Sequence, residues 1–383
     1  MDSKETVLKC RNQRIVLVRI LCIYGMIYVH VPALDTTHGV FNADGYFHFE
    51  FIRAFLIEGY GRTSACLLSV VSGYLVAATL SGKSASIKRF YQRKFNSIYV
   101  PMLIWGLVSI LLFSLVSLLQ PTFITEVCGF DRSLIVSCFD VVFHLTAMSD
   151  GPTMHLAFLR DLFVCMLLAP LLIFLLRSIP IILLAVLLTV YLVDLESVFI
   201  LRPLVVLGFS VGIFIYLNRC RTFWVDRLWV VWLALWIAIT LLIIAFNQDQ
   251  LRELQWAFAA NGLDARESFF YPLSRLFGAL SLWSVSSKLL SLQLFRWCCR
   301  FEPCLFVAFC AHPLILVVIH SVFSFVVKNE LASQLYPIWF LLAPAVAITC
   351  AKIGTLAFLW LMPKLVYKFK GARCAVEAQL SPT

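Results

Sequence analysis

Long apolar runs separated by short polar segments repeat along the whole chain. Within each run the apolar residues are continuous over about 20 positions, the length of a helix that crosses the hydrocarbon core of a bilayer. The predicted fold class is therefore all-α: residues 1–383 form a single membrane-embedded helix bundle, and residues 363–383 form its short C-terminal tail. The pattern predicts ten membrane-spanning helices, at residues 15–34, 63–80, 97–119, 155–176, 179–196, 199–217, 228–247, 269–290, 304–327 and 337–362.

Two connections between these runs differ from ordinary polar loops. Residues 131–149 are apolar but contain Asp140 and His144, which favours an amphipathic or re-entrant segment within a loop. Residues 177–180 are the only break between the fourth and fifth runs, which predicts a tight helical hairpin.

The composition also indicates a membrane protein. Hydrophobic residues make up 61% of the chain and charged residues 14%, and the mean hydropathy is +0.91. Soluble globular domains contain about 45–50% apolar and about 25% charged residues. A soluble enzyme and a disordered chain are therefore excluded. The thirteen cysteines are scattered, without paired CxxC units, so no bound metal is expected. Only Cys128 and Cys138, in one polar-flanked loop, are suited to form a disulfide.

Positive charge is distributed unevenly over the loops. Twenty of the 31 Lys and Arg residues lie in the two terminal segments and in the loops that share their side of a ten-span bundle, whereas six lie in the opposite loops. Because cytoplasmic loops carry an excess of Lys and Arg, both termini are predicted to be cytoplasmic. This topology accounts for the net charge of +10, and no nucleic-acid partner is expected.

Several titratable residues lie inside the predicted spans, where charge is costly and usually faces a bundle interior or a wet cavity. Lys352 and Arg202 suit a snorkelling position near a helix end. Arg160 and Asp161 are adjacent and do not share a helix face, so each is expected to have another partner. The remaining residues of this kind are Arg19, Arg275, His30 and His312.

Arg19 and His30 lie eleven residues apart on the first predicted helix. Eleven steps end about 20° past three full turns, so both side chains share one face and are separated by about 16 Å along the axis. In the predicted topology Arg19 lies near the cytoplasmic surface and His30 lies nearer the outer one. This arrangement suits a phosphate-bearing donor that enters from the cytoplasm. The alternative is an interfacial arginine with a hydrogen-bonded core histidine.

Five motifs follow one another along most of the chain: Arg19-x10-His30; Val71-Ser72-Gly73-Tyr74-Leu75; Phe90-Tyr91-Gln92-Arg93-Lys94 with Ile98-Tyr99-Val100-Pro101; His155-Leu156-Ala157-Phe158-Leu159-Arg160; and Phe309-Cys310-Ala311-His312-Pro313. Together they resemble the motifs of the acyltransferase family 3 of membrane proteins. Ala157 replaces the tryptophan usual in that family, which implies either an altered acceptor pocket or a divergent branch of the family.

The resemblance implies transfer of an acyl group from a cytoplasmic coenzyme A thioester to a hydroxyl of an exported or cell-surface carbohydrate. The donor expected is acetyl-coenzyme A, with succinyl as the alternative, and no bound cofactor is required. The protein would then lie in the bacterial cytoplasmic (inner) membrane, as a multi-pass protein in contact with the lipid bilayer.

The expected catalytic residues are His30, as the base or as the carrier of the acyl group, and Arg19. Glu50 and Glu58 are candidates for an acid that orients the base. Direct transfer and an acyl-imidazole intermediate remain open. The residues expected to contact donor or acceptor are Arg89, Arg93, Lys94, Arg160, Arg275 and His312.

Each of these assignments has a simpler alternative. The cations of residues 83–94 also suit a cytoplasmic loop that only sets topology, and His312 suits a structural polar contact. For the whole chain, a transporter or flippase of an anionic or glycolipid solute is the rival from another class, although no inverted repeat is visible. A membrane sensor or assembly factor without catalytic activity is a third possibility. The sequence indicates no oligomeric state.

Overall fold

The computed structural model describes residues 3–32, 49–82, 86–119, 154–193, 201–220, 222–247, 270–326 and 329–361. These residues form helices and the turns between them, with no strand in the described ranges. The loop at 131–149, the pair Cys128 and Cys138, and the tail at 363–383 lie outside the described residues.

A helix or a pair of helices lies at each of the ten predicted ranges. They are α1 (Ser3–Val29), α3 (Arg62–Leu80), α5 (Val100–Leu119), α8 (Ala157–Leu167) with α9 (Ala169–Ser178), α10 (Pro180–Leu192), α11 (Pro203–Leu217), α13 (Trp229–Asn247), α15 (Tyr271–Leu289), α17 (Leu305–Val326) and α18 (Asn329–Leu361). Only Ile179 separates α9 from α10, at the break predicted between the fourth and fifth runs.

Four helices in the described part of the chain are long and apolar enough to cross a membrane: Phe51–Leu80, Ile87–Leu112, Gln293–His320 and Leu335–Ala357. The pair α8 and α9 would add a fifth. Their length and composition are those of bilayer-spanning segments, so the chain is an integral membrane protein. The number of ten spans and the side on which the termini lie stay predictions.

The predicted fourth span is not one straight helix. Its two halves, α8 and α9, are bent by 59°. Pro170 lies at the start of α9, where its missing N–H and its ring prevent the backbone from continuing the ladder from Met166. The helix predicted at 155–176 is therefore bent, which hydropathy does not indicate, because a proline inside an apolar run leaves the hydropathy unchanged.

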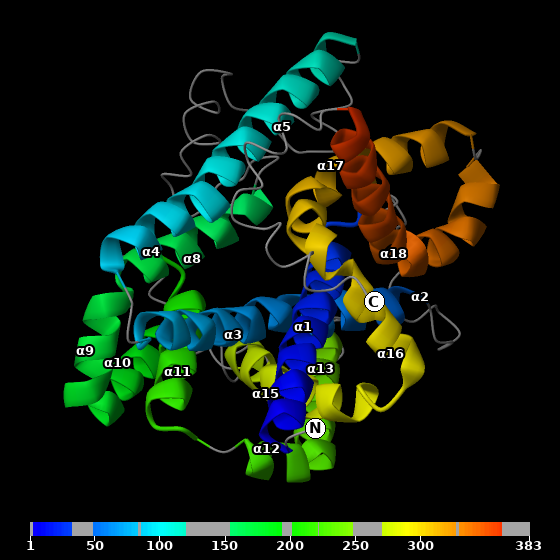
Figure 1. Cartoon of the computed structure of the whole chain (residues 1–383). Helices are drawn as coiled ribbons and strands as arrows, with labels where there is room; N and C mark the ends of the chain where they lie inside the picture. Colours follow the sequence, from blue (N-terminus) through cyan, green and yellow to red (C-terminus); the bar gives the residue numbers. More distant parts are fainter. Residues whose placement is uncertain are drawn as a thin grey trace.

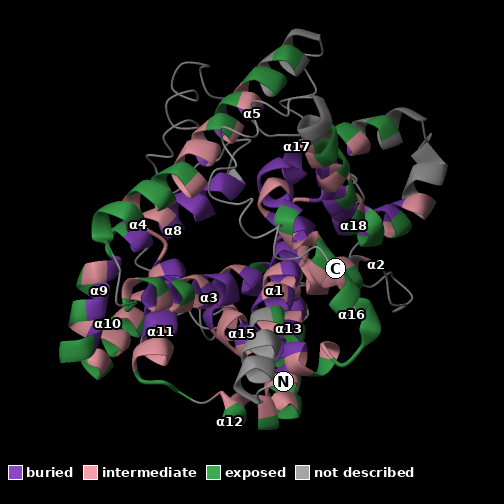
Figure 2. Ribbon diagram, in the orientation of Figure 1, coloured by how far each residue is buried: buried purple, intermediate pink, exposed green. Residues whose placement is uncertain are grey.

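Helix α1 lies at the centre of the molecule and crosses α3, with α17 and α18 near its C-terminal end (Figure 1). Buried residues gather on α1, α3, α11 and α17, whereas much of α5, α9 and α10 is exposed (Figure 2). Exposed leucine and isoleucine on the outer helices include Leu111 and Ile181. In a membrane protein such side chains face lipid, so an apolar outer surface is consistent with the high mean hydropathy of the chain.

Two glycines allow α3 and α11 to pack in close contact. A Cβ atom at Gly73 would overlap the carbonyl oxygen of Phe209, and one at Gly212 would overlap that of Val70. Small residues at such crossings let helix backbones approach within a membrane. Gly73, part of one of the five motifs, therefore serves helix packing.

Three tyrosine hydroxyls attach α1 to its neighbours through backbone carbonyls. Tyr60 donates to Leu21 O at 2.6 Å, Tyr28 donates to Leu341 O at 3.1 Å, and Tyr336 donates to Pro32 O at 3.0 Å. The last two bonds join the C-terminal end of α1 to α18. They fix the position of the residues between them, including His30.

Candidate active site

Three histidines from distant parts of the chain meet at the C-terminal end of α1. His30 follows α1, His155 belongs to the short 3-10 helix η3 (Met154–Leu156), and His312 lies in α17. The ring centroids are 5.1 Å apart for His30 and His312, 5.0 Å for His155 and His312, and 5.9 Å for His30 and His155. His155 and His312 are buried, whereas His30 is half-buried. His30 is thus the most accessible imidazole of this histidine cluster.

Two of these rings are fixed by backbone carbonyls of α17. His155 Nε2 is 3.0 Å from Cys310 O, and His312 Nδ1 is 2.7 Å from Phe309 O. Because a carbonyl oxygen only accepts, both nitrogens are the donors. Within the described part of the chain, no group of three or more His, Cys, Asp or Glu side chains is arranged to hold a metal ion.

A buried carboxylate near this cluster holds two arginines. Asp161 Oδ1 accepts from Arg160 Nε at 2.9 Å and from its Nη2 at 2.6 Å, and Asp161 Oδ2 accepts from Arg202 Nε at 2.6 Å. Asp161 thus has a further partner, Arg202, as expected, and it also pairs with Arg160, because the long arginine side chain folds back onto its neighbour. Arg202, for which snorkelling was the alternative, lies at the start of α11 and pairs with this fully buried acid.

Arg202 also acts on the candidate base. Its positive charge and that of Arg62 influence the His30 ring electrostatically. Arg202 Nη2 is buried and has no hydrogen-bond partner among the residues that the structure describes. A guanidinium N–H therefore remains available near His30.

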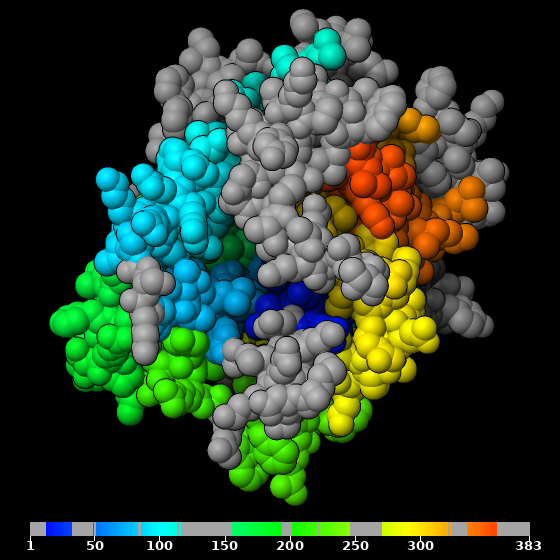
Figure 3. Space-filling model, in the orientation of Figure 1, coloured from blue at the N-terminus to red at the C-terminus, as the bar shows by residue number. Residues whose placement is uncertain are grey.

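Eleven residues before His30, in the interior of α1, Arg19 is paired with an acid. Arg19 Nη1 donates to Glu302 Oε1 at 2.7 Å, and both side chains are about one third exposed. Glu302 belongs to η6 (Cys299–Cys304). Lys94 lies close enough to Arg19 for the two charges to repel each other. Figure 3 shows α1 between the segments of α4 and of α16 (Gln293–Cys298) on one face of the molecule.

The predicted donor-binding arginines lie on α4 (Ile87–Lys94), an amphipathic helix. Ser86 caps its first turn by accepting from Arg89 N, and Phe90 is buried against the bundle. Arg89 and Arg93 are exposed and four residues apart, so they share one face of α4. Lys94, at the end of the same helix, lies close to Arg19, so α4 brings a positively charged region next to Arg19.

Three further predicted site residues are Glu58, Glu50 and Arg275. Glu58 pairs with Arg62 at 2.7 Å, four residues further along. Glu50 lies in α2 (Phe49–Ala54), and its side chain is outside the described set. Arg275 is half-buried in α15, and its Nε has no hydrogen-bond partner among the described residues.

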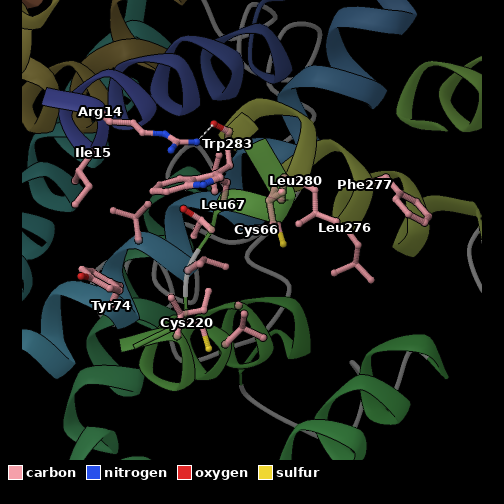
Figure 4. Close-up of a pocket in the computed structure, with 18 of the residues that line it drawn as sticks. Arg14, Ile15, Cys66, Leu67, Tyr74, Cys220, Leu276, Phe277, Leu280 and Trp283 are labelled. Carbon is pink, nitrogen blue, oxygen red and sulfur yellow. Dashed lines mark hydrogen bonds between the residues drawn. The ribbon is translucent and has the colours of Figure 1, made fainter. Parts of the chain in front are cut away.

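A large apolar cavity of about 1050 Å³ lies between α1, α3, α11 and α15. Arg14 is at one end, where its guanidinium lies 4.0 Å from the centroid of the Trp283 ring and donates to Trp283 O (Figure 4). Arg14 also pairs with Asp226 of α12 (Phe223–Arg227). The lining residues recorded for this cavity include none of the three clustered histidines. The cavity is therefore separate from the histidine cluster.

Sequence reasoning missed two members of this site, His155 and Arg202. His155 was visible only as the first residue of one of the five motifs. Its chemical importance depends on contacts with residues far away in the chain, which spacing does not indicate.

Comparison with known proteins gives two matches. The profile of a family described as an acyltransferase domain matches residues 12–362. The chain is 26% identical over 376 residues to the succinoglycan biosynthesis protein ExoH of Rhizobium meliloti (strain 1021), an alignment that covers 96% of this chain and 94% of that protein. No solved structure matches the chain. The resemblance predicted from the five motifs is confirmed by the family profile.

Proposed function

The chain belongs to the acyltransferase domain family, and on that premise we propose that it transfers an acyl group from acyl-coenzyme A to a hydroxyl of an exported or cell-surface carbohydrate. That it is an acyltransferase, and not one that transfers aminoacyl groups, follows from the family and the relative. The carbohydrate acceptor is suggested by that relative, which is described as a protein of succinoglycan biosynthesis.

The main support for the proposal is the arrangement along α1. Arg19 lies next to a positively charged region, and His30, about 16 Å further along, lies in a cluster of histidines. The phosphates of coenzyme A suit the cations of the first region, since arginine binds phosphate in a forked geometry. The flexible arm between those phosphates and the thioester suits the separation along the helix.

In the proposed reaction His30 acts as the general base. Its imidazole removes the proton of the acceptor hydroxyl, the hydroxyl oxygen attacks the thioester carbonyl carbon, and the carbon–sulfur bond breaks. The coenzyme A thiolate then takes a proton from the imidazolium. Arg202 Nη2 has no partner among the described residues, and the Arg202 charge acts on His30, so this side chain is suited to stabilise the oxyanion that develops on the carbonyl.

This account requires the Arg19 end of α1 to face the cytoplasm, as the distribution of Lys and Arg predicts. Single cysteines at positions 93 and 261 should be labelled from opposite sides of the inner membrane, with position 93 accessible from the cytoplasm. Labelling of both from one side would overturn the proposed route of the donor.

Acyl transfer itself is tested with purified protein in lipid vesicles. The vesicles are supplied with radiolabelled acetyl- or succinyl-coenzyme A and an exopolysaccharide extract. The expected result is alkali-labile label on the carbohydrate. Carbohydrate translocation without label, from either donor, would favour the transporter alternative.

Succinyl is the second candidate for the acyl group, and the surroundings of Arg275 favour it. A succinyl group carries a carboxylate, which needs a cation, and Arg275 has a buried Nε without a partner among the described residues. Arg275→Gln should then lower kcat/KM for succinyl-coenzyme A by about tenfold, the loss of one charge-assisted hydrogen bond, and leave the acetyl donor unaffected. An equal effect on both donors would remove this argument for succinyl.

A further inference from the structure

In residues 309–313 of α17, the buried His312 directly precedes a proline, Pro313. In an α-helix, the N–H of residue 313 would donate to the carbonyl of residue 309. Residue 313 is proline and has no N–H, so the Phe309 carbonyl lacks that partner. His312 Nδ1 lies 2.7 Å from this same oxygen. The proline thus leaves an acceptor within its own helix for the histidine that precedes it.

This contact determines which nitrogen of His312 carries the proton. Since Phe309 O can only accept, His312 Nδ1 must donate, and a neutral ring then has a lone pair on Nε2. That Nε2 atom is buried and has no hydrogen-bond partner among the residues that the structure describes. The His312 side chain is fully buried, so a substrate hydroxyl does not reach it without movement of its neighbours.

The half-buried His30 ring lies beside the His312 ring, with a centroid distance of 5.1 Å and an angle of 53° between the ring planes. The buried His155, held by Cys310 O, packs edge-on against both rings and restricts their rotation. A general base on the substrate side is commonly oriented by a buried acceptor behind it.

We propose that His312 is the positioning residue for His30: its Nε2 lone pair accepts a hydrogen bond from one ring N–H of His30, and this turns the other His30 nitrogen toward the acceptor hydroxyl. The inference rests on the proposed function. Glu58 is not available for this role, since it is paired with Arg62. The contact tightens when substrate binds, because catalytic hydrogen bonds are often long without substrate.

The test compares two variants of His312 whose amide side chains differ only in length. In His312→Gln the amide oxygen lies near the position of Nε2 and can still accept from His30. In His312→Asn the amide lies near Nδ1 and cannot reach His30. We expect His312→Asn and His312→Leu to lower kcat on the order of 10²-fold with unchanged KM values for donor and acceptor. His312→Gln should retain about tenfold more activity than His312→Asn.

His320 supplies the matched control. It is a second buried histidine on α17, eight residues after His312, and its Nδ1 also has no partner among the described residues. His320→Leu should leave kcat unchanged. Equal activity of His312→Gln and His312→Asn, or a loss confined to KM, would overturn the positioning role.

A second measurement does not depend on turnover. Solid-state NMR of the ¹⁵N-histidine-labelled protein in lipid, with His312→Gln used to assign the signal, reports the tautomer of His312 directly. The expected tautomer has its proton on Nδ1, and a signal with the proton on Nε2 would contradict the inference. If the tautomer is as expected but the wild type transfers no acyl group, the proposed function fails while the geometry of His312 stands.

Discussion

Arg19 on α1 donates a hydrogen bond to Glu302 at a distance of 2.7 Å, although 283 residues separate the two in the chain. Glu302 is thus bound to the guanidinium that we expect to bind the phosphates of the donor. Glu302 therefore competes with an incoming anion for the same guanidinium.

Removal of this acid should improve donor binding. Glu302→Gln is expected to lower the KM for acyl-coenzyme A by about two- to fivefold, because a partly exposed ion pair contributes at most about 1 kcal/mol. Arg19→Lys should raise the same KM, since an ammonium does not reproduce the guanidinium fork. Steady-state kinetics over a range of donor concentrations measure both. A higher donor KM in Glu302→Gln would mean that the pair itself forms the binding site.

The exposed arginines of α4 should act on the donor alone. Arg93→Ala is expected to raise the donor KM and to leave the acceptor KM unchanged. Higher salt should weaken donor binding more in the wild type than in this variant, because exposed charges are screened beyond about 8–10 Å. Arg296→Ala, which removes an exposed cation of α16, is the control. Identical donor KM values in all three proteins would limit α4 to setting topology.

The buried carboxylate of Asp161 should be essential for stability. Asp161→Asn removes the carboxylate that pairs with the buried Arg160, and removing one partner of a buried pair costs roughly 3–5 kcal/mol. Glu58→Gln, at a more exposed pair, should cost less than about 1 kcal/mol. Unfolding of the purified variants in detergent compares them. Equal stability of the two variants would contradict the buried network.

The contact between α3 and α11 should not tolerate a methyl group. Gly73→Ala is expected to destabilise the protein by about 1–3 kcal/mol, because the new Cβ overlaps the Phe209 carbonyl. Gly354→Ala is the matched control, since no atom lies within 4 Å of a Cβ there. It should be neutral or stabilising. Thermal unfolding in the same detergent provides the comparison, and a neutral Gly73→Ala would mean that the helices separate more readily than their packing indicates.

Hydropathy was sufficient to locate the helices, because a bilayer-spanning helix needs only length and apolar composition. It missed the bend at Pro170, since one proline leaves the hydropathy of a run unchanged. The spacing of Arg19 and His30 was readable because both lie on one helix. The partners of these residues were not readable: Glu302, His155 and Arg202 are brought to them by tertiary packing between distant helices.

The charged residues show the same limit. Adjacency places the Cβ atoms of Arg160 and Asp161 on different faces, but the end of the long arginine side chain reaches the neighbouring carboxylate. Glu50 and Glu58, chosen from the usual triad pattern as acids to orient His30, stay predictions. The position of His312 beside His30 depends on packing between distant helices, which the sequence does not show.

If His30 is the base for acyl transfer, its removal should slow the transfer step without weakening the binding of the donor. Wild type and His30→Ala are reconstituted in lipid at equal amounts, and the initial rate of label transfer from acyl-coenzyme A to the carbohydrate is measured. The transfer rate of His30→Ala is expected to be roughly 10²–10⁴-fold lower, with the affinity for coenzyme A, measured by calorimetry, unchanged. A His30→Ala enzyme that keeps more than about a tenth of the wild-type rate would contradict it.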